Sequence, residues 1–451
     1  MSNNMEKRKD RILLCLCHLS GNEQKFVNEA FDTNWVVPLG PNVNGFEKDL
    51  EEFVGQNKRV VALSAGTAAV HLALLNCGVG PGDEVCVQSF TFCASSHPIT
   101  YLGATPVFID SEKDTWNMDP ELLEEAINDR IAKTGKKPKA IVPVALYGMP
   151  YKMDRIMEIA NRYDIPVVED AAEGFGSKYK GQVLGTFGRY GVLSFNGNKM
   201  ITTSGGGALI TATDDEWREI MMYATQYRES YPYYQHEKIG YNYRMSNICA
   251  GIGRGQMTIV DEHIAHHKHV QKLYEELLKD VPGIHVHSQP SRISEFENIP
   301  VYDSNYWLCT MTIDPDVKVK GQENAYKQVI TGAVGGTAGV IHAAESATTD
   351  CQPNDNVEAM RMGLDALNIE SRPLWKPMHK QPVYRRGEIQ VSSFKIKEQE
   401  CQCVTTESSV AYVNGVSEDL FKVGMCLPAG PYVTDDDVKF ICEAIKSLII
   451  K

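Results

Sequence analysis

The alternation of short apolar runs with helical stretches between residues 59 and 211 constrains the fold more than any other feature of this chain. Seven apolar runs predict β-strands, at residues 59–63, 84–87, 106–109, 140–144, 166–169, 192–195 and 207–211. Four stretches with helical periodicity separate the first five runs, at residues 68–76, 92–102, 120–132 and 153–163. Such a succession predicts an α/β fold with a mostly parallel central sheet and helices on both of its faces.

The rest of the chain predicts a second, smaller domain. Residues 214–227 and 247–278 have helical patterns, and beyond about residue 280 the alternation becomes weaker and mixed, as in an α+β domain. A chain of 451 residues is long for one domain and comfortable for two. We therefore expect a large α/β domain at residues 1–280, with an N-terminal arm at 1–58, and a small C-terminal domain at 281–451.

Within the small domain, residues 318–350 are expected to form an insertion. They contain a run of small residues at 332–339, but this run lacks the Gly-Lys-Ser/Thr ending of a nucleotide-binding P-loop. We therefore assign no function to the insertion.

Composition limits the possible partners and location. The formal net charge of −13 argues against nucleic acid and anionic membranes. No uninterrupted apolar stretch is long enough to span a bilayer, and the apolar run at residues 12–17 is too short for a signal peptide. The 12 cysteines are scattered without C-x-x-C spacing, so we expect reduced thiols and a cytoplasmic protein.

A carboxylate and a lysine follow two of the predicted strands. Asp170 ends the run at 166–169, and Lys199 comes just after the run at 192–195 and before three glycines. Pyridoxal phosphate needs a lysine amine that bonds to its aldehyde and an acid that keeps its pyridine nitrogen protonated. A surface lysine and a helix-capping aspartate are the ordinary alternatives. They would explain each residue alone but not the pair, which predicts a pyridoxal phosphate site.

Two further segments could complete such a site. Gly66 and Thr67 lie at a predicted strand-to-helix turn, where backbone N–H groups and a hydroxyl can bind the phosphate, and Ser194 offers a second hydroxyl. The same Gly-Thr pair is also an ordinary helix start. Phe90 or Phe92, at the next turn, could stack on the cofactor ring, although either could equally belong to the core.

Together these segments resemble the DegT/DnrJ/StrS family of sugar aminotransferases, which are pyridoxal phosphate enzymes of fold-type I. The resemblance runs from about residue 35 to the C-terminus and keeps the order of the family's motifs. Six motifs carry it: Ser64-Ala65-Gly66-Thr67-Ala68-Ala69, Ser89-Phe90-Thr91-Phe92, Glu169-Asp170-Ala171-Ala172-Glu173, the segment 194–199, Gly240-Tyr241-Asn242-Tyr243-Arg244-Met245-Ser246-Asn247, and Arg372-Pro373-Leu374-Trp375-Lys376-Pro377-Met378-His379.

The resemblance implies a role for each cofactor residue. Lys199 would bond covalently to the cofactor and later carry a proton, and Asp170 would pair with the pyridinium nitrogen. Three residues would bind the phosphate, namely Gly66, Thr67 and Ser194. Phe92 would stack on the ring. Glu173 stands where many members carry glutamine or histidine facing the ring, a departure that could tune the cofactor's hydroxyl.

The resemblance also implies partners. Asn242 would reach the phosphate of a neighbouring subunit's cofactor, so the active unit would be a homodimer with shared active sites. Four residues fall where the family lines the substrate mouth, namely Arg372, Trp375, Lys376 and His379. An amino-acid donor, L-glutamate by family habit, and a keto-sugar nucleotide would alternate in one site with ping-pong kinetics. The segments at 35–40 and 375–379 look most like members that act on UDP-linked 4-keto-6-deoxy sugars for surface polysaccharides or glycans.

Other functions remain as alternatives. A dehydratase on the same scaffold would replace the lysine with histidine, whereas Lys199 is intact. A non-catalytic regulator would lack the lysine or aspartate, or would carry a basic helix-turn-helix segment. A nicotinamide enzyme would need Gly-x-Gly-x-x-Gly after the first strand. Four clustered histidines lack an arranged carboxylate and predict a solvated or interface patch rather than a metal site, namely His263, His266, His267 and His269.

Overall fold

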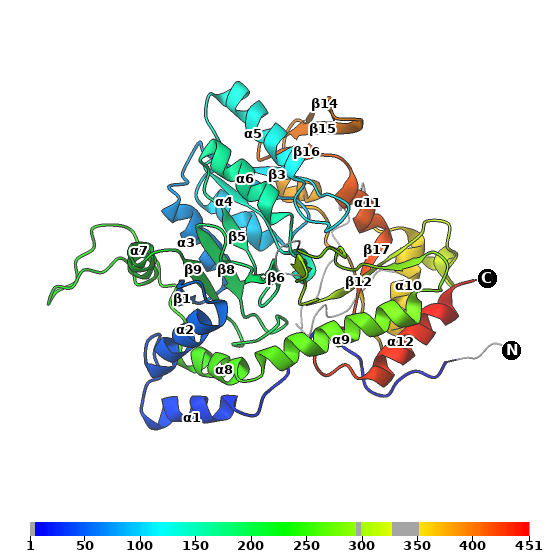
Figure 1. Ribbon diagram of the computed structural model, residues 1–451, viewed down its shortest axis with the longest axis horizontal. Helices are drawn as coiled ribbons and strands as arrows, with labels where there is room; N and C mark the ends of the chain where they lie inside the picture. Colours follow the sequence, from blue (N-terminus) through cyan, green and yellow to red (C-terminus); the bar gives the residue numbers. More distant parts are fainter. Residues whose placement is uncertain (1–4, 295–298, 327–350, 451) are drawn as a thin grey trace.

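The computed structural model describes residues 5–294, 299–326 and 351–450 (Figure 1). Its central feature is a sheet of seven strands in the order β1-β9-β8-β5-β4-β2-β3, in which two bridges, Ile141–Val167 and Val144–Asp170, join β4 to β5. The strands are β1 (Arg59–Leu63), β2 (Glu84–Gln88), β3 (Thr105–Ile109), β4 (Ala140–Val142), β5 (Val168–Asp170), β8 (Tyr190–Ser194) and β9 (Gly207–Thr211). Six of these strands run in one direction, and β9 alone runs in the opposite direction. The predicted mostly parallel α/β sheet is therefore confirmed.

Helices cover both faces of the sheet because alternate strand residues point to opposite sides. In β1, Val60 and Ala62 belong to one core cluster, whereas Val61 and Leu63 belong to another. The first cluster also contains side chains of α2 (Pro41–Val54), α5 (Pro120–Thr134) and α6 (Met153–Tyr163). The second contains side chains of α3 (Gly66–Asn76), α4 (His97–Tyr101) and α7 (Asp214–Ala224).

A second sheet, all antiparallel, forms the centre of the C-terminal part of the chain. Its order is β10 (Ile284–Val286), β12 (Cys309–Ile313), β17 (Gly424–Leu427) and β13 (Arg372–Pro373). A separate core cluster packs this sheet against α9 (Val260–Leu278), α10 (Asp355–Ala366) and α12 (Asp435–Leu448).

Two segments cross the domain boundary expected at residue 280. β16 (Val410–Val413) pairs in parallel with β3, and β15 (Gln399–Thr405) and β14 (Gln390–Ile396) extend the large sheet beyond it (Figure 1). Conversely, Ile12 bridges Ile369 and belongs to the core of the C-terminal part. N-terminal residues thus pack on the C-terminal part of the chain, and a hairpin from the C-terminal region extends the large sheet, while the boundary at residue 280 stays a prediction.

The remaining elements are short or peripheral. They comprise α1 (Glu23–Asp32), α8 (Asn247–Met257), α11 (Val416–Val423), the small sheet of β6 (Lys178–Tyr179), β7 (Gln182–Val183) and β11 (Tyr302–Asp303), and 3₁₀ turns at Cys93–Ser95, Leu146–Gly148, Gln322–Asn324, Met378–Lys380 and Pro382–Tyr384. Among the described residues, no helix combines the length and apolarity needed to cross a membrane. Residues 327–350, most of the predicted insertion, lie outside the described residues.

Three predicted helices differ from the structure. The helix predicted at 92–102 is a 3₁₀ turn followed by α4, because Pro98 suits the first turn of a helix and not its interior. The helix predicted at 247–278 is two helices, since Ile259 leaves the helical conformation (φ −130°, ψ 12°). α7 ends three residues early because Gln226 and Tyr227 have positive φ values of 59° and 52°.

Candidate active site

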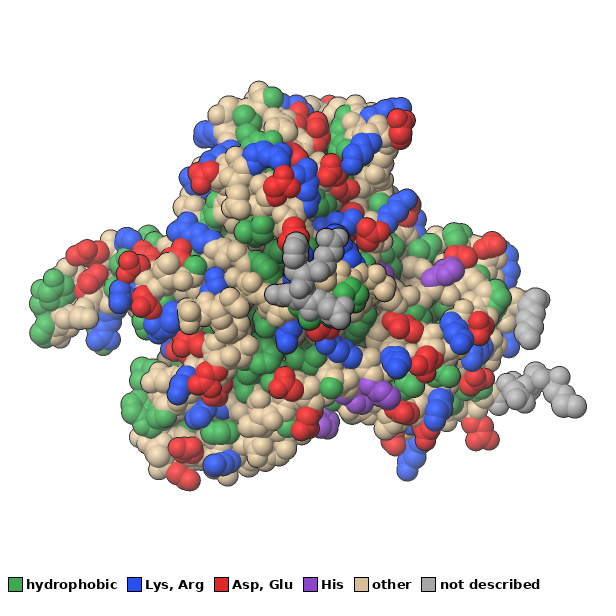
Figure 2. Space-filling model, in the orientation of Figure 1, with side chains coloured by type: hydrophobic (Ala, Val, Ile, Leu, Met, Phe, Trp, Pro, Cys, Tyr) green, Lys and Arg blue, Asp and Glu red, His purple; other side chains and the backbone are tan. Residues whose placement is uncertain are grey.

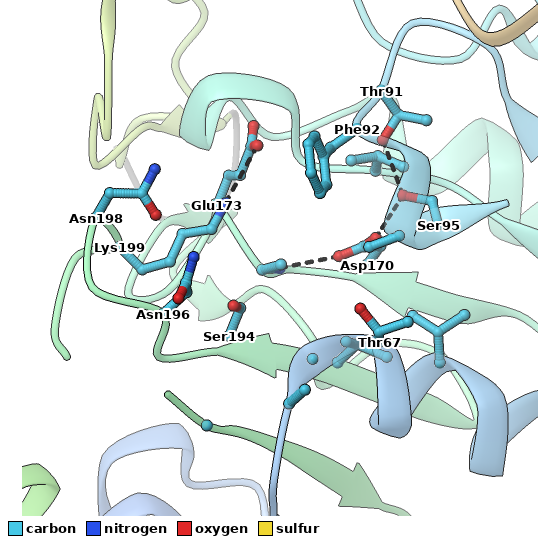
Figure 3. A pocket seen from close by; sticks show the side chains of 18 of the residues that line it. Thr67, Thr91, Phe92, Ser95, Asp170, Glu173, Ser194, Asn196, Asn198 and Lys199 are labelled. Atoms are coloured by element: carbon cyan, nitrogen blue, oxygen red, sulfur yellow. Dashed lines mark hydrogen bonds and ion pairs between the residues drawn. The ribbon is translucent and has the colours of Figure 1, made fainter. Parts of the chain in front are cut away.

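A cavity of about 330 Å³ opens at the carboxyl ends of β1, β5 and β8 (Figure 3), where open α/β sheets place their ligand sites. Its volume is within the range of small-molecule pockets. Polar and aromatic side chains that were far apart in the sequence meet in its lining: Ser64, Thr67, Thr91, Phe92, Ser95, Asp170, Glu173, Ser194, Asn196, Asn198, Lys199, Trp307 and Trp375.

Lys199 lies on the loop that links β8 to β9. Its ammonium Nζ is 3.3 Å from Glu173 Oε1 and 3.9 Å from the ring centroid of Trp307. The loop is fixed by its backbone, because the carbonyl of Asn198 accepts hydrogen bonds from Trp307 Nε1 (2.6 Å) and from the thiol of Cys15 (3.1 Å). The lysine is thus held between a carboxylate and an aromatic face, with its amine in the cavity.

Asp170 ends β5 and is only 4% exposed. Ser95 Oγ donates to its Oδ2 at 2.6 Å, and the backbone N–H of Ala172 donates to its Oδ1 at 3.1 Å. Burial raises the pKa of Asp170, while these two hydrogen bonds and the charge of Lys199 oppose the rise. A buried carboxylate without a directly paired cation would be stabilised by a positive charge placed in the cavity.

Glu173 lies three residues beyond Asp170 and faces the same cavity (Figure 3). Its Oε2 accepts the backbone N–H of Tyr147 at 2.7 Å, which leaves Oε1 for Lys199. Burial raises the pKa of Glu173, and the charge of Lys199 opposes that rise. Glu173 therefore anchors the lysine amine in addition to facing the cavity.

The start of α3 forms the floor opposite the lysine loop. Its N-cap, Ala65, is extended and offers no side-chain cap, so the first N–H groups of the helix remain open to an anion. A side chain at Gly66 would be tight, because a Cβ there would lie 3.1 Å from the Cβ of Ser194. Gly207 is required behind it, because a Cβ would lie 2.3 Å from the backbone nitrogen of Gly66. Thr67 and Ser194, which carry hydroxyls, line the same cavity.

Aromatic side chains flank the mouth of the cavity. Phe92 is 55% exposed, and its ring centroid is 6.2 Å from that of Trp375. Both residues also line an adjoining cavity that includes Lys376. Two of the four predicted mouth residues, Trp375 and Lys376, therefore lie near the cavity.

The other predicted residues lie elsewhere. Arg372 pairs with Glu370 at 2.8 Å and lines neither cavity. His379 is buried and hydrogen-bonded, so it does not present its ring to either cavity. Asn242 forms a backbone bridge with Thr225 outside this chain's cavity, and its predicted reach into a neighbouring subunit stays a prediction.

Sequence reasoning missed Ser95 and Trp307. Ser95 follows Phe92 by three residues and could have been found as a hydroxyl on the same turn. Trp307 is separated from Lys199 by more than a hundred residues, and no local pattern links them.

The four clustered histidines make separate contacts. His263 Nδ1 contacts the carbonyl of Met200, whereas His267 contacts that of Tyr306. The other two contact Val433 and Asp435. In the part of the chain that the structure describes, no group of three or more His, Cys, Asp or Glu side chains is arranged to hold a metal ion.

A lysine amine, a buried carboxylate and an uncapped helix N-terminus around one cavity of an α/β sheet define the class of fold-type I pyridoxal phosphate enzymes. The chain belongs to the DegT/DnrJ/EryC1/StrS aminotransferase family, whose model matches residues 18–334. The family resemblance of the sequence motifs is thereby confirmed, and with it the aminotransferase class and pyridoxal phosphate as the cofactor of that class.

Individual relatives agree with this assignment. The chain is 40% identical over 441 residues (97% of this chain, 96% of the relative) to the Bacillus subtilis protein named "Putative pyridoxal phosphate-dependent aminotransferase EpsN". It is 32% identical over 429 residues, 95% of each chain, to the GDP-perosamine synthase of Escherichia coli O157:H7. A solved family aminotransferase from Brucella abortus superposes with a TM-score of 0.75 at 26% identity and 96% coverage of both chains.

The residues present fit pyridoxal phosphate. Asp170 would supply a buried negative charge for the ring nitrogen, the start of α3 with Ser194 would hold the phosphate, and Lys199 would supply the amine. When bound, the cofactor supplies an electrophilic carbon and a ring that accepts electrons from the substrate.

Proposed function

We propose that this chain transfers an amino group from L-glutamate to a nucleotide-linked keto sugar. The observation that carries the proposal is the position of Lys199 Nζ, in a cavity with Asp170, behind a mouth made of two aromatic rings and the cation of Lys376. Aromatic rings suit a sugar or base, and a cation suits a diphosphate.

Each side chain of the site has a task in this reaction. Asp170 holds the proton of the ring nitrogen, and Ser95 orients the carboxylate through its 2.6 Å hydrogen bond. Lys199 Nζ acts as the general base that takes the α-proton of the donor in the first half-reaction, and in the second half-reaction it delivers a proton to the acceptor carbon. Glu173 Oε1, 3.3 Å from that amine, holds it near the reacting atoms when it is free.

The names of three relatives support a nucleotide-sugar acceptor. GDP-perosamine synthases from Escherichia coli and Caulobacter vibrioides are each 32% identical to this chain, over 95% and 98% of its length. A UDP-2-acetamido-2-deoxy-3-oxo-D-glucuronate aminotransferase from Pseudomonas aeruginosa is 37% identical over 264 residues, 58% of this chain. We propose a UDP-linked 4-keto-6-deoxy sugar as acceptor, and a GDP-linked keto sugar is the second candidate because the GDP-perosamine relatives match nearly the whole chain.

We also propose a cytoplasmic enzyme of surface polysaccharide or glycan biosynthesis that works as a homodimer with shared active sites. The arm after α7 extends away from the body of the molecule (Figure 1) and carries apolar side chains near its tip (Figure 2). Tyr231, Tyr233, Tyr234 and Ile239 are exposed there, which suits burial by a second copy. Asn242 bridges Thr225 at the base of this arm, and we propose that it is shared between the two subunits.

An absorbance spectrum of the purified protein tests the first half of the reaction. We expect a yellow cofactor band that bleaches when L-glutamate is added, and no such covalent band in Lys199→Ala. Restoration of the band by a UDP-linked or a GDP-linked 4-keto-6-deoxy sugar, tested side by side, identifies the acceptor. A band that glutamate leaves unchanged would contradict the proposed donor, and one that neither sugar restores would contradict the proposed acceptor.

Mixing two inactive variants tests the shared sites. Lys199→Ala and Asn242→Ala chains, unfolded together and refolded as mixed dimers, should regain activity if Asn242 acts on the partner's site. In that case both defects fall in one site and the other is intact. A mixture as inactive as the single variants would show that Asn242 serves its own chain.

A further inference from the structure

A second cavity adjoins the cofactor cavity and has two walls. Thr91 and Phe92, on the turn after β2, form one wall, and Trp375 and Lys376, on the segment before the 3₁₀ turn at Met378–Lys380, form the other. Since Thr91, Phe92 and Trp375 line both cavities, the distance between the walls determines what can reach the reacting centre.

Behind the second cavity, a chain of hydrogen bonds connects the two walls. Ser89 Oγ lies 2.6 Å from His379 Nδ1, and His379 Nε2 lies 3.1 Å from Glu418 Oε1. The backbone adds two bonds to the same residue, because Met378 N–H donates to the Ser89 carbonyl (2.8 Å) and His379 N–H donates to Ser89 Oγ (3.3 Å). Lys380 Nζ contacts the second oxygen of Glu418 at 3.1 Å.

A carboxylate can only accept, so Nε2 of His379 donates a hydrogen bond to Glu418 Oε1. Ser89 Oγ accepts the backbone N–H of His379 and also lies within hydrogen-bond distance of Nδ1. Although partial burial opposes ionisation, hydrogen bonds from His379 and Lys380 lower the pKa of Glu418 to about 2. The acceptor at the end of the chain is therefore a carboxylate at neutral pH.

Ser89 and Glu418 are the two ends of this network, and both are anchored to the large sheet. Ser89 directly follows β2, and its N–H donates to the carbonyl of Ile109 in β3. Glu418 lies in the first turn of α11, where the N–H of Ser417 donates to Asp110 at the end of β3. The histidine between them is thus one attachment point of the Trp375–Lys376 wall, beside the hydrogen bond from the Trp375 N–H to Tyr147.

A Ser-His-Glu chain also occurs in hydrolases, but this one has no exposed nucleophile. Ser89 is 0% exposed and lines neither cavity. A substrate carbonyl has no route to its Oγ, so the chain can act only through the segments that it holds.

We propose that Ser89, His379 and Glu418 form a positioning network that fixes the wall of Trp375 and Lys376 against Phe92 and thereby sets affinity for the acceptor. The effect on the amino donor is small, because a small amino acid needs only the cofactor cavity. The identity of the acceptor rests on the proposed function, whereas the role of the network in fixing the wall of Trp375 and Lys376 does not.

Hydrogen–deuterium exchange of the cofactor-loaded protein, without substrate, tests whether the network fixes the segment that carries Trp375 and Lys376. In Glu418→Ala, which removes the acceptor for His379, we expect the amides of residues 374–381 to exchange about tenfold faster than in the wild type. Glu418→Gln keeps an acceptor oxygen and should restore most of the protection. Asp419→Ala is the matched control, since it removes a carboxylate from the same turn of α11 that is exposed and pairs with Lys422.

Half-reaction kinetics test the consequence for substrates. In Glu418→Ala, the KM for L-glutamate should change less than about twofold, while the KM for the keto-sugar nucleotide should rise about tenfold with little change in kcat. Unchanged exchange at 374–381 would overturn the network. So would a proportional loss in both half-reactions accompanied by a lower Tm, which indicates a general loss of structure. A wild-type protein that does not respond to glutamate would instead contradict the proposed function. The exchange result would then decide by itself whether the network fixes residues 374–381.

Discussion

Ser95→Ala is the substitution that most directly tests how this site works. The hydroxyl of Ser95 donates to Asp170 Oδ2 at 2.6 Å, and the carboxylate is only 4% exposed, so water cannot replace the lost donor without rearrangement. The only other donor to Asp170 is the N–H of Ala172, on the opposite oxygen, among the described hydrogen bonds.

The expected magnitude follows from that geometry. A hydrogen bond to a charged group contributes about 1.5–3 kcal/mol, which corresponds to about a 10-fold to 150-fold change in an equilibrium constant. The apparent Kd for pyridoxal phosphate should rise by that factor in Ser95→Ala. Because the Ser95 hydrogen bond opposes the burial that raises the pKa of Asp170, its loss should raise that pKa further. The acid limb of the donor half-reaction should then move to higher pH.

The assay is an absorbance titration of cofactor-free protein with pyridoxal phosphate, repeated over a range of pH. Ser96→Ala is the control, because Ser96 is equally buried but contacts Cys93 and Tyr384 instead of the carboxylate. If Ser95→Ala bound the cofactor as tightly as Ser96→Ala at every pH, the orientation of Asp170 by Ser95 would be refuted.

Three other substitutions test the surroundings of the site. Gly207→Ala would place a Cβ 2.3 Å from the nitrogen of Gly66 and should weaken cofactor binding in the same titration, whereas the open position 205 should tolerate alanine. Trp307→Leu removes the ring that faces the ammonium of Lys199, and stopped-flow absorbance should show the donor half-reaction slowed about 2-fold to 30-fold, with Trp307→Phe affected less. Arg244→Met leaves the buried Glu47 without its cation and should cost about 3–5 kcal/mol of unfolding free energy in a urea titration; an unchanged midpoint would mean that Glu47 finds another partner.

Local patterns predicted the architecture and the centre of the site. The spacing of apolar residues that marks a strand or a helix appears among consecutive residues, so the sheet could be derived from the apolar runs between residues 59 and 211. Carboxyl ends of parallel strands meet at one edge, so two residues at such ends, Asp170 and Lys199, were expected to approach each other. The structure places both in one cavity with the start of α3.

The sequence by itself therefore determined the sheet, its helical cover and the chemical groups at the strand ends, because each depends on neighbours in the chain. Tertiary structure alone decided which distant groups complete them. Trp307 reaches the Lys199 loop, His379 turns away from the mouth toward Glu418, and β16 crosses back to β3. These contacts join residues separated by tens to hundreds of positions. Their partners are selected by the packing of whole domains, and local sequence periodicity carries no information about that packing.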